Sequence, residues 1–152
     1  MAKRKAVKRP DAIQLLKQDH AKVKKAFKQF EKLKDQEGAQ AQEIIAMVLE
    51  DLKLHTQLEE EIFYPALREV LEDDLLDEAQ VEHNSAKVLM QDLERMKPGQ
   101  PLYAATFTVL GEYVEHHVKE EEGEMFPKAS KKVDVRALGE QILARKEQAG
   151  KA

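Results

Sequence analysis

Apolar residues recur at intervals of three and four along four stretches of the chain, and this spacing predicts four amphipathic helices. The predicted helices span about Asp11 to Asp35, Ala39 to Leu71, Glu72 to Lys97, and the turn at Pro98–Pro101 to Pro127. Proline lacks an amide proton, so we expect the second helix to bend or break near Pro65. Asp134 is the predicted N-cap of a short fifth helix that ends near Gln148.

The connections between the four predicted helices are short, which favours antiparallel neighbours. The sequence therefore predicts an all-α fold, namely an up-down-up-down four-helix bundle with a short fifth C-terminal helix. We expect a basic disordered tail over residues 1–10, the bundle over residues 11–130, and a C-terminal helix and tail over residues 131–152. A chain of 152 residues suffices for one domain with a buried core.

Each predicted apolar stripe contains one histidine where an apolar side chain is expected. These residues are His20, His55, His83 and His117. Two of them are followed one helical turn later by a glutamate on the same face, in His55-x-x-x-Glu59 and His117-x-x-x-Glu121. Burying ionised carboxylates close together is unfavourable unless a cation lies between them. The pattern therefore predicts a metal site inside the bundle.

The ligand motif occurs twice because the two halves of the chain repeat each other. His55 and His117 are 62 positions apart, Pro65 and Pro127 are 62 apart, and His20 and His83 are 63 apart. Each His-x-x-x-Glu motif is followed by an aromatic residue and a proline, with Tyr64 in the first half and Phe126 in the second. Each half thus supplies one histidine from its first helix and a His-Glu pair from its second.

Two arrangements without metal remain open from the residues alone. One is a buried His–Glu hydrogen-bond network, and the other is a solvated acidic face, because Glu59 and Glu121 each lie in a run of three glutamates. His116 lies about 100° around the helix from His117, so it is a weaker candidate ligand and otherwise supports the ligands from behind or lies at the surface. We expect the three tyrosines to be packing residues, although one near a metal could supply a hydrogen bond or an electron.

The chain has no cysteine, which excludes thiolate zinc sites, iron–sulfur clusters and disulfides. Four imidazoles and two carboxylates exceed what one tetrahedral zinc requires and suit two metal ions bridged by carboxylates. Nitrogen and oxygen ligands fit iron, with manganese or zinc as other occupants. We expect two Fe ions, and a bridging oxide or hydroxide would bring the charge of the centre closer to neutrality.

These motifs, with their Tyr64-Pro65 and Phe126-Pro127 endings, resemble the bacterial hemerythrin-like, or HHE cation-binding, family over about residues 11–129. The resemblance implies a four-helix bundle with a non-haem di-iron centre that binds or reacts with dioxygen, nitric oxide or peroxide. It implies four terminal ligands, which are His20, His55, His83 and His117, and two bridging ligands, which are Glu59 and Glu121.

The chain departs from the oxygen-carrying hemerythrins on its third helix. Those proteins have a His-x-x-x-His pair there, whereas the positions four away from His83 are Ala79 and Lys87. One imidazole is missing, which argues for a more reactive or exchangeable centre and against reversible oxygen carriage. We also expect Ala79 and Ala86 to leave room for a ligand beside His83.

The leading hypothesis is a di-iron protein that binds, senses or scavenges O2, NO or peroxide, or that handles iron. A second hypothesis is a di-iron enzyme that acts on peroxide or repairs iron centres, although no other acid–base or nucleophilic arrangement is visible. A third is a metal-free helical interaction protein that uses its basic tail. The net charge is −4, and the first ten residues carry five positive charges without interleaved aromatics, so nucleic acid is not an expected partner. Without a long apolar run we expect no membrane partner and a cytoplasmic protein.

Overall fold

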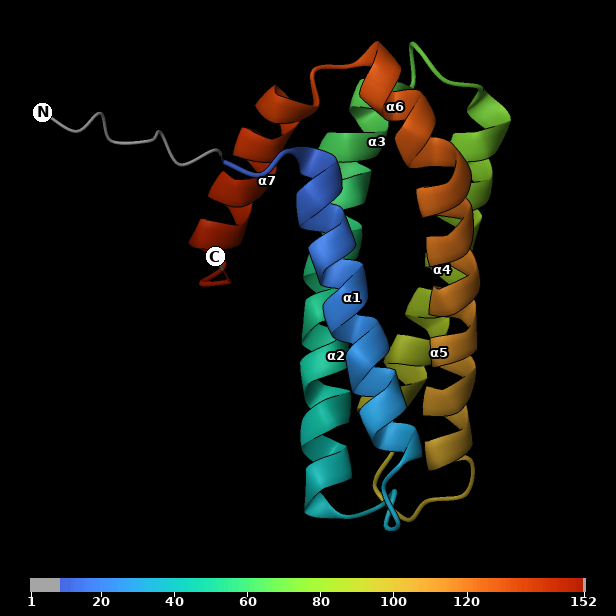
Figure 1. Cartoon of the computed structure of the whole chain (residues 1–152). Coiled ribbons are helices and arrows are strands. Elements are labelled where there is room, and N and C mark those ends of the chain that lie inside the picture. Colours follow the sequence, from blue (N-terminus) through green and yellow to red (C-terminus); the bar gives the residue numbers. More distant parts are fainter. Residues whose placement is uncertain (1–8, 152) are drawn as a thin grey trace, which may run out of the picture.

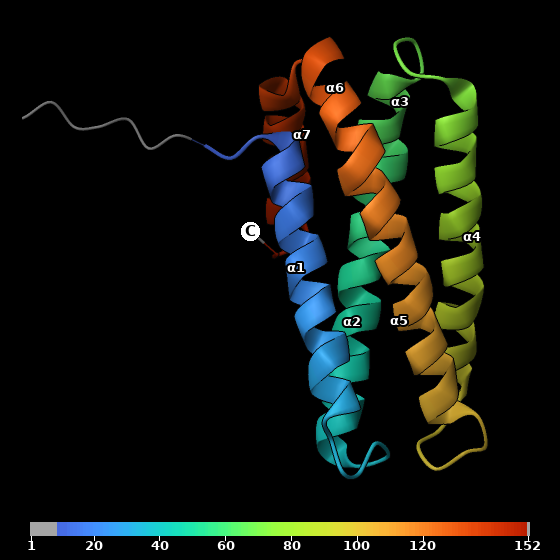
Figure 2. The ribbon, with the colours of Figure 1, turned by 45° about the vertical axis from the view of Figure 1, so that its right-hand side comes forward.

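The computed structural model describes residues 9–151, which fold into antiparallel helical rods (Figure 1). The four long helices are α1 (Ala12–Glu31), α2 (Ala39–Leu58), α4 (Asp73–Arg95) and α5 (Tyr103–Glu120). A further helix, α7 (Val135–Gln148), packs against α1 on the outside of the bundle (Figure 2). The predicted all-α bundle with a fifth C-terminal helix is confirmed. Residues 1–8 of the predicted basic tail lie outside the described part of the chain.

Local capping explains where several helices begin and end. Asp11 and Gln14 form a capping box at the start of α1, in which each side chain accepts the other's amide at 2.9 Å. Asp134 caps α7 as predicted, because its Oδ1 accepts the amides of the second and third helical residues at 3.1 Å. The predicted end of the first helix at Asp35 is wrong. Asp35 instead accepts the Glu37 amide at 3.0 Å and forms a turn after α1 has ended.

Two of the four helical rods, the one that begins with α2 and the one that begins with α5, each contain a π-helical turn. The first is η1 (Glu59–Phe63), which leads into α3 (Tyr64–Leu67), and the second is η2 (Glu121–Met125), which leads into α6 (Phe126–Lys132). The amides of Tyr64 and Phe126 donate to carbonyls five residues back, at Glu59 and Glu121. Each π turn thus starts on a predicted glutamate ligand and directly precedes the aromatic-proline pair of its half.

Pro65 therefore does not break its rod. The π turn lies immediately before the proline, which occupies the first turn of α3, where a missing amide proton is tolerated. The rod ends at Leu67, so the predicted extension to Leu71 is wrong.

The histidines divide the core into two apolar clusters. One cluster lies toward α3, α6 and α7 and includes Leu16, Phe63 and Phe126, and the other lies toward the opposite end and includes Phe30 and Phe107. A polar layer is thereby enclosed between two packed ends. None of the helices within residues 9–151 is long and apolar enough to cross a membrane.

Candidate metal centre

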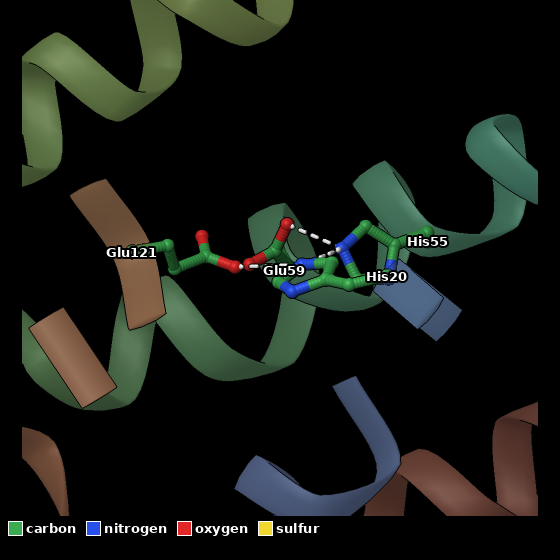
Figure 3. Close-up of side chains that lie close together, drawn as sticks. All are labelled: His20, His55, Glu59 and Glu121. Carbon is green, nitrogen blue, oxygen red and sulfur yellow. Dashed lines mark hydrogen bonds and ion pairs between the residues drawn. The ribbon is translucent and has the colours of Figure 1, made fainter. Parts of the chain in front are cut away.

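The structure brings all six predicted ligands together in the middle of the bundle. Their donor atoms form two groups that share both glutamates, and within each group all donors lie within 4.8 Å of one another. The groups are His20, His55, Glu59 and Glu121, and Glu59, His83, His117 and Glu121. Figure 3 shows the first group, in which the imidazole and carboxylate ends converge from α1, α2, η1 and η2.

The imidazoles face each other in two pairs. The Nε2 atoms of His20 and His55 are 3.2 Å apart, and those of His83 and His117 are also 3.2 Å apart. Neighbouring donors around a metal ion with bonds of about 2.1 Å lie roughly 3 Å apart, so this spacing suits a shared ion. Two imidazole lone pairs at this distance repel each other unless a proton or a metal ion lies between them.

The two glutamates connect the imidazole pairs. Glu59 Oε1 lies 2.9 Å from Nε2 of His55 and 3.2 Å from Nε2 of His83. Glu121 approaches one member of each pair, with Oε1 3.2 Å from His20 and Oε2 3.1 Å from His117. Each carboxylate therefore reaches both groups, as a bridging ligand would.

Both carboxylates are buried, so their negative charge has to be balanced by a nearby positive charge. Glu59 is 0% exposed and Glu121 is 1% exposed. Both oxygens of Glu59 and Oε1 of Glu121 lack a hydrogen bond of regular geometry among the described residues. An ionised carboxylate in such surroundings is costly without a cation, so the donor set fits a metal ion.

In the metal-free protein, protons supply part of that charge. Burial favours neutral imidazole, but the charge of Glu59 and hydrogen bonds to Asp19 and Glu59 raise the pKa of His55 to about 10. Burial also lowers the pKa of His117, but hydrogen bonds to carboxylates outweigh this effect. The bond to Glu121 is the largest of them, and together they raise the pKa of His117 to about 12. Although burial opposes it, the charge of His55 holds the pKa of Glu59 well below its usual value.

A second set of carboxylates contacts the outer nitrogens of the histidines. Three of the Nδ1 atoms each lie within hydrogen-bond distance of a carboxylate: His55 of Asp19 (3.0 Å), His83 of Glu60 (3.1 Å) and His117 of Glu82 (2.9 Å). The fourth, Nδ1 of His20, lies 3.6 Å from Glu122. A carboxylate on Nδ1 keeps the proton there and leaves the Nε2 lone pair for a metal.

Helical periodicity does not single out these outer carboxylates, although the repeat carries a signal for them. Asp19 and Glu82 each precede the first-helix histidine of their half, and Glu60 and Glu122 each follow the glutamate ligand. Each one serves a histidine from a different helix, so its role becomes visible only in the folded bundle.

Tyr64 is more than a packing residue and follows the alternative expectation for a tyrosine near a metal site, because it supplies a hydrogen bond there. Its hydroxyl donates to Oε2 of Glu121 at 2.6 Å and lies 3.3 Å from Nε2 of both His83 and His117. Burial and the nearby glutamates raise the pKa of Tyr64 well above its usual value. Its repeat counterpart, Phe126, stacks on His20 with ring centroids 5.8 Å apart and offers no oxygen.

His116 lies outside the centre. Its side chain is 67% exposed, and it forms a surface group with Glu82 and Glu120. Of the two alanines expected to leave room for a ligand, Ala86 lines a cavity beside the histidines. Ala79 is instead packed in an apolar core cluster, so the expectation for Ala79 is wrong.

The cavity adjoins all four candidate histidine ligands. Its volume is about 30 Å³ for a water-sized molecule, which is enough for one or two such molecules. Beside the histidines its wall is largely apolar and includes Leu52, Ala86, Met90, Val114 and Val118. The half-exposed Tyr113 also lines it, so the cavity approaches the surface of the bundle on that side.

Comparisons with known proteins agree with this geometry. The hemerythrin HHE cation binding domain family matches residues 11–129. A solved hemerythrin HHE cation binding domain-containing protein from Mycobacterium kansasii has a TM-score of 0.78 and 25% identity, over 91% of this chain and 86% of that chain. A DNA nickase from Nostoc sp. is 27% identical over 112 residues, which are 74% of this chain but only 31% of that protein.

The family match and the buried His/Glu groups together support metal-ion binding. The match covers most of the chain and includes every candidate ligand. The chain belongs to the hemerythrin HHE cation-binding domain family.

Proposed function

We propose that this domain holds two metal ions, both iron, and uses them to bind a small diatomic molecule such as dioxygen or nitric oxide. The observation that carries the proposal is the two pairs of facing imidazoles, each 3.2 Å apart, around two buried carboxylates of which three oxygens lack a regular hydrogen bond among the described residues. Bound iron would supply a redox-active Lewis acid at this position.

The first metal position would have ligands His20, His55, Glu59 and Glu121, and the second His83, His117, Glu59 and Glu121. The Tyr64 hydroxyl lies beside the second set at distances that resemble those between neighbouring ligands. Nitrogen and oxygen donors without sulfur suit iron, and the same donors suit manganese. The two positions would therefore be unequal, with one more oxygen near the second.

The cavity supports a small and uncharged ligand. A volume of about 30 Å³ excludes metabolites, and the largely apolar wall offers few partners for a molecule that needs several hydrogen bonds. Dioxygen and nitric oxide meet both conditions, whereas peroxide, which both donates and accepts hydrogen bonds, fits the wall less well.

The activity named for the Nostoc relative is not what the centre favours. The candidate ligands are at most 9% exposed, and the adjoining cavity is far smaller than a nucleotide. A phosphodiester bond of DNA could not reach the donors without opening the bundle. The chain also spans about a third of that relative, whose nicking activity can reside in its remaining length.

Titration of anaerobic, ferrous-loaded protein with nitric oxide tests the proposal. We expect saturable binding, with an optical change that the metal-free protein does not give. Absence of any change in fully loaded protein would overturn diatomic binding. Sustained turnover of added peroxide, in place of stoichiometric binding, would favour the enzyme hypothesis.

A further inference from the structure

A lysine of α7 is connected to the candidate metal centre through a single carboxylate. The Lys146 side chain is 10% exposed, and its Nζ lies 2.5 Å from Oδ1 of Asp19. The other oxygen of Asp19 lies 3.0 Å from Nδ1 of His55. Nε2 of His55 in turn lies 2.9 Å from Oε1 of Glu59, one of the two shared glutamates. One carboxylate therefore joins the C-terminal helix to a candidate ligand on α2.

We infer that Lys146 is a positioning residue for the first metal position, and that α7 is part of the metal centre. This inference rests on the proposed metal binding. A carboxylate held at both oxygens cannot rotate, so Asp19 fixes the plane of the His55 ring and the direction of its Nε2 lone pair. Asp19 is 21% exposed, so without Lys146 one of its oxygens would turn to water and His55 would lose its fixed acceptor.

The same arrangement occurs at the second metal position. Lys87 lies 2.7 Å from Oε1 of Glu60, and the other oxygen of Glu60 lies 3.1 Å from Nδ1 of His83. A lysine, a carboxylate and an imidazole thus follow one another on each side of the centre. Lys87 belongs to the bundle itself, whereas Lys146 lies beyond the family match, which ends at residue 129. The first position consequently depends on a segment outside the matched domain.

The docking of α7 is close enough to hold a lysine in place. A Cβ built on Gly139 would lie 2.8 Å from the backbone nitrogen of Ala12, so α7 meets the start of α1 at backbone contact. Ile142 is 0% exposed, one turn before Lys146. Arg145 forms an ion pair with Glu61 in the first π turn. These contacts hold α7 against α1 and against the first π turn, next to Lys146 in the sequence.

The test is a titration of the metal-free full chain with Co²⁺, which has visible absorption bands sensitive to its ligands. We compare the wild-type chain with Lys146→Met, Lys146→Arg, Asp19→Asn and the Lys146→Met/Asp19→Asn double variant. The matched control is Lys151→Met, which removes the same charge near the same end of the chain. Lys151 pairs with Glu50 on α2, 3.0 Å away, and within the described residues no ion pair joins it to Asp19 or to a candidate ligand.

We expect Lys146→Met to weaken one of two Co²⁺ binding events by about 10- to 100-fold and to alter its absorption bands. The other event should be unchanged, Lys146→Arg should retain much of the affinity, and Lys151→Met should resemble the wild type. The double variant should bind no more weakly than Asp19→Asn, because both changes interrupt one connection.

Unchanged affinity and bands in Lys146→Met would overturn the inference. Equal weakening of both events, in parallel with a lower melting temperature of the metal-free protein, would also overturn it, since that pattern indicates general destabilisation. The wild-type titration separates the two proposals. Two binding events there support the proposed function whatever Lys146 does, and no binding overturns both.

Discussion

Tyr64 and Glu121 are joined by a hydrogen bond of 2.6 Å, although they are 57 residues apart and belong to different halves of the internal repeat. The same hydroxyl lies 3.3 Å from the facing nitrogens of His83 and His117. The first half of the chain therefore contributes an oxygen to the histidine pair of the second half. At the position that corresponds to Tyr64, the second half has Phe126, whose ring stacks on His20 and carries no oxygen.

Replacing Tyr64 with phenylalanine tests this asymmetry. The repeat already accommodates phenylalanine at the corresponding position, so the core should tolerate the change. We expect the affinity of the second metal position to fall by about 10- to 100-fold and that of the first to change less, because the hydroxyl lies beside His83 and His117 and holds the Glu121 oxygen that faces His117. A competitive metal titration measures this. Tyr103→Phe, far from the centre, is the control, and an equal loss at both positions would contradict the prediction.

Metal uptake should release protons. The pKa values of about 10 for His55 and about 12 for His117 mean that both imidazoles carry protons at pH 7 in the metal-free protein. A metal ion must displace those protons, so its apparent affinity should fall as the pH is lowered. Calorimetric titration in buffers of different ionisation enthalpy counts the protons. A result near zero protons released at pH 7 would be incompatible with the prediction.

The same pKa values predict opposite pH dependences of stability for the two forms. In the metal-free protein, protonated His55 and His117 stabilise the fold because their pKa values are raised. This contribution is complete below about pH 6.5, and it is lost as the pH rises through 10 and then 12. In the metal-loaded protein the bound imidazoles take no proton. The histidines of the unfolded chain do bind protons below about pH 6.5, so the stability of the loaded protein should fall there. Melting curves from pH 5 to 10 distinguish the forms, and identical profiles would argue against this account.

Enlarging Ala86 should fill the cavity beside the histidines. In Ala86→Leu, we expect nitric oxide binding to weaken at least about tenfold while metal content is retained, because the ligand and the new side chain compete for about 30 Å³. Val88→Leu, on the exposed side of the same helix, is the control. Unaltered nitric oxide binding in loaded Ala86→Leu would place the ligand elsewhere.

The contact between α7 and α1 should tolerate no side chain at Gly139. Gly139→Ala places a Cβ against backbone atoms that cannot move aside, and we expect a loss of about 1–3 kcal/mol in the free energy of unfolding. Gly123→Ala meets no atom within 4 Å and should instead stabilise the protein by about 0.5–1 kcal/mol. Chemical denaturation of both variants checks the pair. A neutral Gly139→Ala would mean that α7 is loosely attached.

The bundle and its six candidate ligands were predictable because they depend on helical periodicity alone. Residues four apart share a face of an α-helix, so His55 and Glu59 had to point the same way. Tyr64 was not predictable by that rule, since five residues of α-helix would turn it about 140° away from Glu59. The π turn, with its bond from residue 64 to residue 59, brings the two onto one side.

The Lys146 connection could not be predicted for a different reason. It depends on how a separate helix docks, and the apolar pattern of α7 fixes its buried face without fixing its neighbour. The close approach at Gly139 determines that α7 packs against the start of α1, and a glycine within a helix does not by itself predict such a contact.

Metal content of the purified full chain is the most direct test of the central claim that these six side chains form a two-metal centre. Protein from iron-supplied cells should contain about two metal ions per chain, mostly iron, and His55→Ala should fall toward one. His116→Ala, at the exposed surface, should keep the wild-type content. Fewer than about one metal ion per chain, unchanged by His55→Ala, would contradict the account and favour a metal-free helical protein.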